Sequence, residues 1–119
     1  MELKIDKVIE TVLYVSDIER ADAFYRQVLK LPAMVANERF RAYNVGDWSV
    51  LLLFIEGDSL RGAQYPTGFI PAHDGVGPAH IGLAVAKEQL PHWERHLVAN
   101  GVEIEGRMRW RSEERRVGK

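Results

Sequence analysis

Apolar and polar positions alternate along residues 8–15, where β-branched and aromatic side chains predominate. A period of two and this composition predict a β-strand. Beyond it the apolar period lengthens to that of a helix, which is expected to run to about Lys30 and is ended by Pro32. Ser16 and Glu19 have the spacing of a capping box, so Ser16 is predicted to cap this helix.

Three shorter strands are expected after the helix, at residues 33–38, 39–45 and 49–56. The last of them contains a continuous apolar run, which is typical of a strand covered on both faces. Residues 57–78 then hold a high density of glycine and proline, which predicts a long connection rather than a regular element. Connections of this length tend to be functional. The first unit of the chain is therefore predicted to be βαβββ.

The same order of elements begins again after this connection. A strand is expected at 80–86, a helix at about 89–100 and a further strand at 102–110. The apolar positions of the strand at 80–86 match those of the strand at 8–15, which indicates a weak internal repeat of a strand–helix unit.

The last nine residues, 111–119, break this pattern with six charges and a single apolar residue of the buried type. Two more strands would complete a second module, and this stretch cannot supply an inner strand. It also resembles the in-frame translation of a sequencing adapter, so we interpret it as foreign sequence that replaces the carboxyl terminus; a charged disordered tail is the alternative. The expected organisation is a single domain over 1–110, with a first module at about 5–57, a linker at 58–77, a partial second module at 78–110 and a non-native tail at 111–119.

Composition narrows the classes of function. A net charge of −1 gives no basic surface for nucleic acid or for an anionic membrane. The chain has no cysteine, which excludes disulfides, thiolate nucleophiles and thiolate metal sites. No apolar run approaches the roughly 20 residues that span a bilayer, and the amino terminus has no apolar core of the secretory kind. We therefore expect a cytoplasmic protein that binds neither nucleic acid nor membrane.

Two segments resemble a known family. Residues 9–31, which run from a strand through Val-Ser-Asp into a helix with Phe-Tyr, resemble the opening unit of the vicinal oxygen chelate superfamily of glyoxalases, bleomycin-resistance proteins and extradiol dioxygenases. Lys30 stands where that family usually has glycine. Residues 77–85, Gly-Pro-Ala-His-Ile-Gly-Leu-Ala-Val, resemble its fifth strand. The resemblance covers about residues 5–110 and implies an α+β fold, in which paired βαβββ modules form a cupped mixed sheet; the second module is incomplete here.

The resemblance also implies a divalent metal ion in the cup. The family's first-strand histidine falls on Glu10 and its fifth-strand histidine on His80, whereas its fourth-strand glutamate falls near Leu52, which cannot bind metal. Carboxylate plus imidazole suits Fe, Mn, Ni or Zn, and such an ion can polarise vicinal oxygens of a substrate. Glu10 and His80 are thus the candidate metal ligands and catalytic residues. The alternatives are an inert strand histidine for His80 and a substrate-binding or base role for Glu10.

Four other residues are candidates for substrate binding. Tyr14 could line the cup or only pack, and His73, on the glycine-rich connection, could reach the mouth of the cup or remain a solvated loop residue. Arg107 and Arg109 alternate on the last expected strand, where they could bind an anionic substrate or form an exposed strand face.

Two functions from different classes follow. The first is a divalent-metal-dependent enzyme, either a glyoxalase-like lyase or a dioxygenase, acting on a small oxygenated metabolite. The second is a metal-free protein that binds a drug, as bleomycin-resistance proteins do, and Leu52 at a ligand position favours it. An incomplete second module would leave a sheet edge uncovered, so we expect either low stability or obligate pairing of this chain, with a homodimer as the expected assembly.

Overall fold

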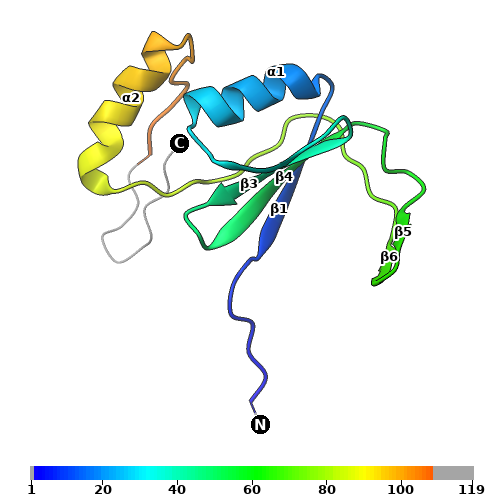
Figure 1. Cartoon of the computed structure of the whole chain (residues 1–119). Coiled ribbons are helices and arrows are strands. Elements are labelled where there is room, and N and C mark those ends of the chain that lie inside the picture. Colours follow the sequence, from blue (N-terminus) through cyan, green and yellow to red (C-terminus); the bar gives the residue numbers. More distant parts are fainter. Residues whose placement is uncertain (1, 109–119) are drawn as a thin grey trace. The chain divides into compact units, whose positions relative to one another are not determined.

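The computed structural model describes residues 2–108. The chain divides into two compact units, the first ending at Pro78 and the second beginning at Ala79. Arg109 and the tail interpreted as foreign sequence lie outside the described residues. The first unit contains β1 (Glu10–Val15), α1 (Ile18–Ala23), a π-helical turn η1 (Phe24–Val28), β2 (Ala33–Ala36), β3 (Phe40–Val45), β4 (Ser49–Ile55), β5 (Ala63–Tyr65) and β6 (Gly68–Ile70); the second contains a 3₁₀ turn η2 (Lys87–Gln89) and α2 (Leu90–Ala99) (Figure 1).

A four-stranded mixed sheet in the order β1-β4-β3-β2 forms the body of the first unit. β1 runs parallel to β4, and the other neighbouring strands are antiparallel. The βαβββ order predicted from the apolar pattern is confirmed, and so is the α+β class with a curled mixed sheet. In the part of the chain that the structure describes, no helix is both long and apolar enough to cross a membrane.

One face of the sheet packs against α1, which lies across it in Figure 1. The register places Tyr43 beside Leu51 on this face, and both are almost fully buried together with Leu53. α1 contributes Ile18, which is 7% exposed. The hydrophobic core of the first unit therefore lies between α1 and strands β3 and β4.

The start of α1 differs from the prediction. Asp17, not Ser16, is the N-cap: its backbone is extended and its carboxylate accepts the N–H of Arg20 at 3.1 Å. An aspartate cap adds a negative charge at the positive end of the helix dipole, which a serine would not. At its other end the helix passes through η1, and Lys30 then adopts a φ of +60°, a conformation that favours glycine.

The connection after β4 is more structured than predicted. β5 and β6 form an antiparallel hairpin in which Gln64 pairs with Phe69, around a turn at Pro66 and Thr67. Proline preorganises such a turn, and the short strands on either side can then pair locally. The prediction of a connection without regular structure was therefore wrong for residues 63–70.

The second unit contains the predicted helix as α2 but not the predicted strands. Residues 80–86 hold only a single bridge at Leu83, and residues 102–108 hold no strand. Burial still alternates at 81, 83 and 85, as a strand pattern would give. Alternation of apolar residues specifies which side chains turn inward. A strand also needs a hydrogen-bonded neighbouring strand along its length, and the alternation does not show whether such a neighbour is present.

Candidate functional site

The sheet face opposite α1, here called the distal face, carries the first-unit residues predicted from the family resemblance. Strand register places side chains of β1, β4 and β3 in three rows across this face, because paired residues project to the same side. Apart from exposed Glu10 and buried Ala42, these side chains are half-buried. The rows are Glu10, Val50 and Asn44; Val12, Leu52 and Ala42 (the central row); and Tyr14, Phe54 and Phe40 (the aromatic row).

Tyr14 and His73, each predicted as a substrate-binding candidate, lie together on this face. The Tyr14 hydroxyl is 2.7 Å from His73 Nδ1, although 59 positions separate them in the chain. The His73 ring also meets Phe54 edge-on at 4.7 Å between centroids, and Phe54 stacks on Phe40 at 5.4 Å. The connection therefore folds back so that His73 lies against the aromatic row.

Three contacts hold this part of the connection in place. The backbone N–H of His73 donates to the carbonyl of the buried Ser59 at 3.0 Å. Asp74 Oδ1 accepts the N–H of Gly57 at 2.8 Å. Gly75 lies so close to the Tyr14 ring that a Cβ there would come within 2.7 Å of it. Residues 73–75 are thus fixed to the end of β4 and to Tyr14.

The electrostatics of this pair favour one protonation state. Burial raises the pKa of the Tyr14 hydroxyl above its ordinary value of 10.0, and the charge of Asp74 raises that pKa further. The phenol is therefore protonated at neutral pH and can donate its O–H to Nδ1 of His73. Asp74 and Gly75 were not predicted as site residues, because only the folding back of the connection brings them to Tyr14. Phe54 was not predicted either, although strand register alone places it beside Tyr14.

Glu10 and His80 belong to different units. Glu10 is the exposed first residue of β1, and its neighbours in its row are Val50 and Asn44. Leu52 lies in the adjacent row, where the family's fourth-strand ligand is expected. Within residues 2–108 no group of three or more metal-ligating side chains is placed to hold an ion. The donors of the distal face therefore do not fit a firmly held divalent metal.

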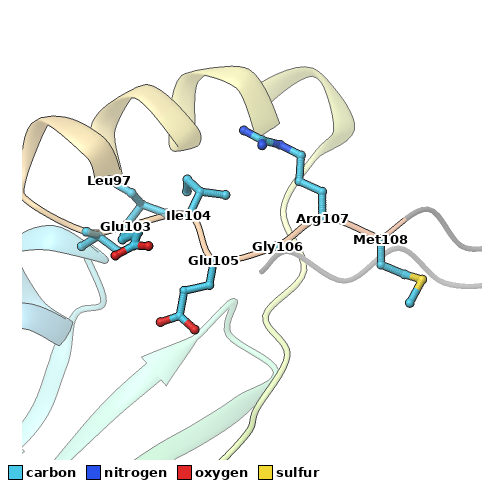
Figure 2. Close-up of a pocket in the computed structure, with 8 residues that line it drawn as sticks. Leu97, Glu103, Ile104, Glu105, Gly106, Arg107 and Met108 are labelled. Atoms are coloured by element: carbon cyan, nitrogen blue, oxygen red, sulfur yellow. The ribbon is translucent and has the colours of Figure 1, made fainter.

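Arg107 does not lie on a free strand face as predicted. Its Nε and Nη2 donate to the carboxylate of Glu94 on α2 at 3.2 and 3.3 Å. Figure 2 shows Arg107 and Ile104 pointing toward α2 and Glu105 pointing away from it. A groove of about 540 Å³ runs along this segment. Glu103 also lines this groove, and the negative charge of its carboxylate does not favour the binding of an anionic ligand there.

This fold agrees with a family assignment from the sequence. The model of the Glyoxalase/Bleomycin resistance protein/Dioxygenase superfamily matches residues 5–116, and the chain belongs to this superfamily. The resemblance identified in the strand–helix unit and at the fifth strand is confirmed. No curated protein matches the sequence.

The solved structures that resemble this chain include a relative at substantial identity. A lactoylglutathione lyase from Agrobacterium tumefaciens is 30% identical, with a TM-score of 0.77 over 90% of this chain and 79% of that one. The fosfomycin resistance protein FosX from Listeria monocytogenes is 17% identical, with a TM-score of 0.63 over 96% and 81% of the two chains. An integron cassette protein from the Halifax Harbour sewage outfall metagenome is 19% identical, with a TM-score of 0.64 over 86% and 77%. The last two show the fold alone.

Proposed function

We propose that this chain binds a small oxygenated metabolite on the distal face and acts on it as a glyoxalase-like lyase or a dioxygenase. The arrangement of this face carries the proposal: an apolar central row lies between a carboxylate at Glu10 and the hydrogen-bonded pair of Tyr14 and His73. Sites for small molecules are mostly apolar and contain a few placed polar groups. The similarity to a lactoylglutathione lyase supports the lyase form of the proposal.

The metal-dependent form of the proposal assigns Glu10 and His80 as ligands of Fe, Mn, Ni or Zn. Members of this superfamily typically use divalent metals, and a bound ion would supply Lewis-acid polarisation of the substrate oxygens. The described residues do not provide a donor set that fits such an ion, since Leu52 occupies the place of a third ligand. The polar contacts to the substrate on the distal face are therefore assigned to side chains of this chain.

A metal-free binding protein is the second candidate, and Leu52 on the distal face favours it. In that case Tyr14, His73 and the apolar central row would bind a drug or metabolite without reaction. Arg107 and Arg109 would contribute to an anionic ligand only if the ion pair of Arg107 with Glu94 were released. A homodimer and a cytoplasmic location complete the proposal.

Metal titration separates the two candidates. Calorimetry of the metal-free chain with Mn(II), Ni(II), Zn(II) and, anaerobically, Fe(II) should show stoichiometric binding if the metal-dependent form is correct. Glu10→Ala and His80→Ala should each abolish it, whereas the exposed controls Glu38→Ala and His92→Ala should not. Binding that survives both ligand variants, or no binding at all, would leave the metal-free candidate.

A further inference from the structure

His73 is the polar side chain that the connection fixes against the distal face. Its backbone donates to Ser59, its ring packs edge-on against Phe54, and its Nδ1 meets the Tyr14 hydroxyl. The flanking contacts of Asp74 and Gly75 restrain the same segment. The imidazole of His73 is therefore held both by side chains of the sheet and by the connection that carries it. A binding group whose position is fixed in this way is preorganised for a ligand.

The tautomer of this ring follows from its partner. The protonated phenol of Tyr14 can donate to Nδ1, and an imidazole that accepts there carries its ring proton on Nε2. Within residues 2–108, Nε2 of His73 makes no hydrogen bond, and the side chain is half-buried. This ring nitrogen belongs to a side chain that packs on the aromatic row, and the central row adjoins that row on the same face of the sheet.

We propose that His73 donates a hydrogen bond from Nε2 to a carbonyl or enolate oxygen of the substrate, whose apolar body lies on Val12 and Leu52. This inference rests on the proposed binding of a small molecule to the distal face and names its substrate class as a small apolar carbonyl compound. Neighbouring rows on one face of a strand are roughly 6.5 Å apart, a span that an aryl ketone covers. In this assignment His73 is a catalytic residue that touches the substrate, and Tyr14 is a positioning residue that fixes its tautomer.

The chemistry of this contact requires no transfer of atoms. A fixed N–H donor binds a carbonyl oxygen weakly and binds it more strongly as negative charge develops there, so it stabilises an enolate relative to the ketone. His73 keeps its proton throughout, and Tyr14 remains protonated. The role is therefore compatible with either a lyase or a binding protein that selects carbonyl ligands.

Nitrogen-15 NMR of the imidazole tests the tautomer without any ligand. The wild-type chain should show His73 with an unprotonated Nδ1 and a protonated Nε2. Tyr14→Phe keeps the ring but removes the hydroxyl, so it should give a mixture of tautomers, while the control Tyr65→Phe on β5 should change nothing. A protonated Nδ1 in the wild-type chain would overturn the inference, because Tyr14 would then be the acceptor.

Two probes of the same shape test the carbonyl contact. Acetophenone and α-methylstyrene differ in whether an oxygen or a methylene group meets the donor. The wild-type chain should prefer acetophenone, and His73→Phe should lose about fivefold in that preference, as expected for one hydrogen bond. His73→Gln, whose amide N–H can replace Nε2–H, should recover part of it.

The outcomes of this comparison are distinct. If both probes bind the wild-type chain equally, or if His73→Phe keeps the preference, the role of His73 is wrong while binding at the distal face stands. If neither probe shifts the amide signals of Val12 and Leu52, the assigned substrate class is wrong and the inference fails, whereas the proposed function is tested separately by the metal titration.

Discussion

Arg41 carries a positive charge into the core between α1 and the sheet, where the residue is only 6% exposed. Its Nη2 donates to Glu19 at 3.0 Å, and its Nε lies 3.6 Å from Asp22 Oδ2. Asp22 also accepts the Tyr43 hydroxyl and pairs with Arg26 at 2.7 Å. Removing one partner of such a network leaves a buried charge without compensation. Asp22 is therefore the residue on which the burial of Arg41 depends most.

The pKa of Asp22 gives this network a pH dependence. Burial acts to raise that pKa, but the Tyr43 hydroxyl and the charges of Arg26 and Arg41 outweigh it and lower the pKa below its ordinary value. A lowered carboxyl pKa stabilises the fold above the unfolded-state value of about 3.9, and this stability is lost as the pH falls through the folded-state pKa. The contribution of Asp22 to the free energy of unfolding should therefore be lost as the pH falls below about 4.

Asp22→Asn should remove this dependence. At pH 7 we expect a loss of about 2 kcal/mol in the free energy of unfolding, because Arg41 loses the charge of its less exposed carboxylate partner and keeps only the exposed Glu19. Below pH 4 the loss should shrink, since protonated Asp22 resembles asparagine. Denaturant unfolding between pH 2.5 and 7 measures both values, and Glu19→Gln at an exposed partner of Arg41 should cost little. A difference between wild type and Asp22→Asn that is the same at all pH values would contradict the assignment.

Among the elements, the strands β1 to β4 could be predicted from their apolar pattern, because that pattern records which faces of a sheet are covered. The continuous apolar run of β4 also matched its position between β1 and β3. The hairpin of β5 and β6 was missed because it depends on a local turn within a segment rich in glycine. For the site, Tyr14 and His73 were each predicted, but their pairing depends on where the connection folds back, which no local pattern encodes.

The junction between η1 and β2 offers a test at the scale of one element. Lys30 adopts a left-handed backbone conformation, in which a Cβ costs about 1 kcal/mol relative to glycine. Lys30→Gly should therefore raise the free energy of unfolding by up to about 1 kcal/mol, despite the extra entropy of glycine in the unfolded chain. Lys30→Ala removes the same charge but keeps the Cβ, so it should not stabilise. Equal effects of the two variants in thermal denaturation would show that the backbone conformation is not the cause.

At the scale of the whole molecule, the first unit exposes several large apolar side chains. Leu3 and Ile5, in the extended segment before β1, are 88% and 90% exposed. In the sheet that the structure describes, β1 is an edge strand with β4 as its neighbour. An edge strand beside exposed apolar side chains promotes association. We therefore expect the predicted homodimer, if it forms, to pair through this region.

Sedimentation velocity over a range of concentrations tests this association. The wild-type chain should form a dimer or larger species as its concentration rises, because pairing removes the side chains of Leu3 and Ile5 from water. The double variant Leu3→Lys and Ile5→Lys should shift the equilibrium toward the monomer by about tenfold or more, since burying two charges opposes contact. Val76→Lys is a matched control on the connection, where the side chain is 79% exposed. A wild-type chain that sediments as a monomer throughout, and unfolds cooperatively as one, would contradict the predicted dimer and show that the first unit tolerates its exposed apolar surface alone.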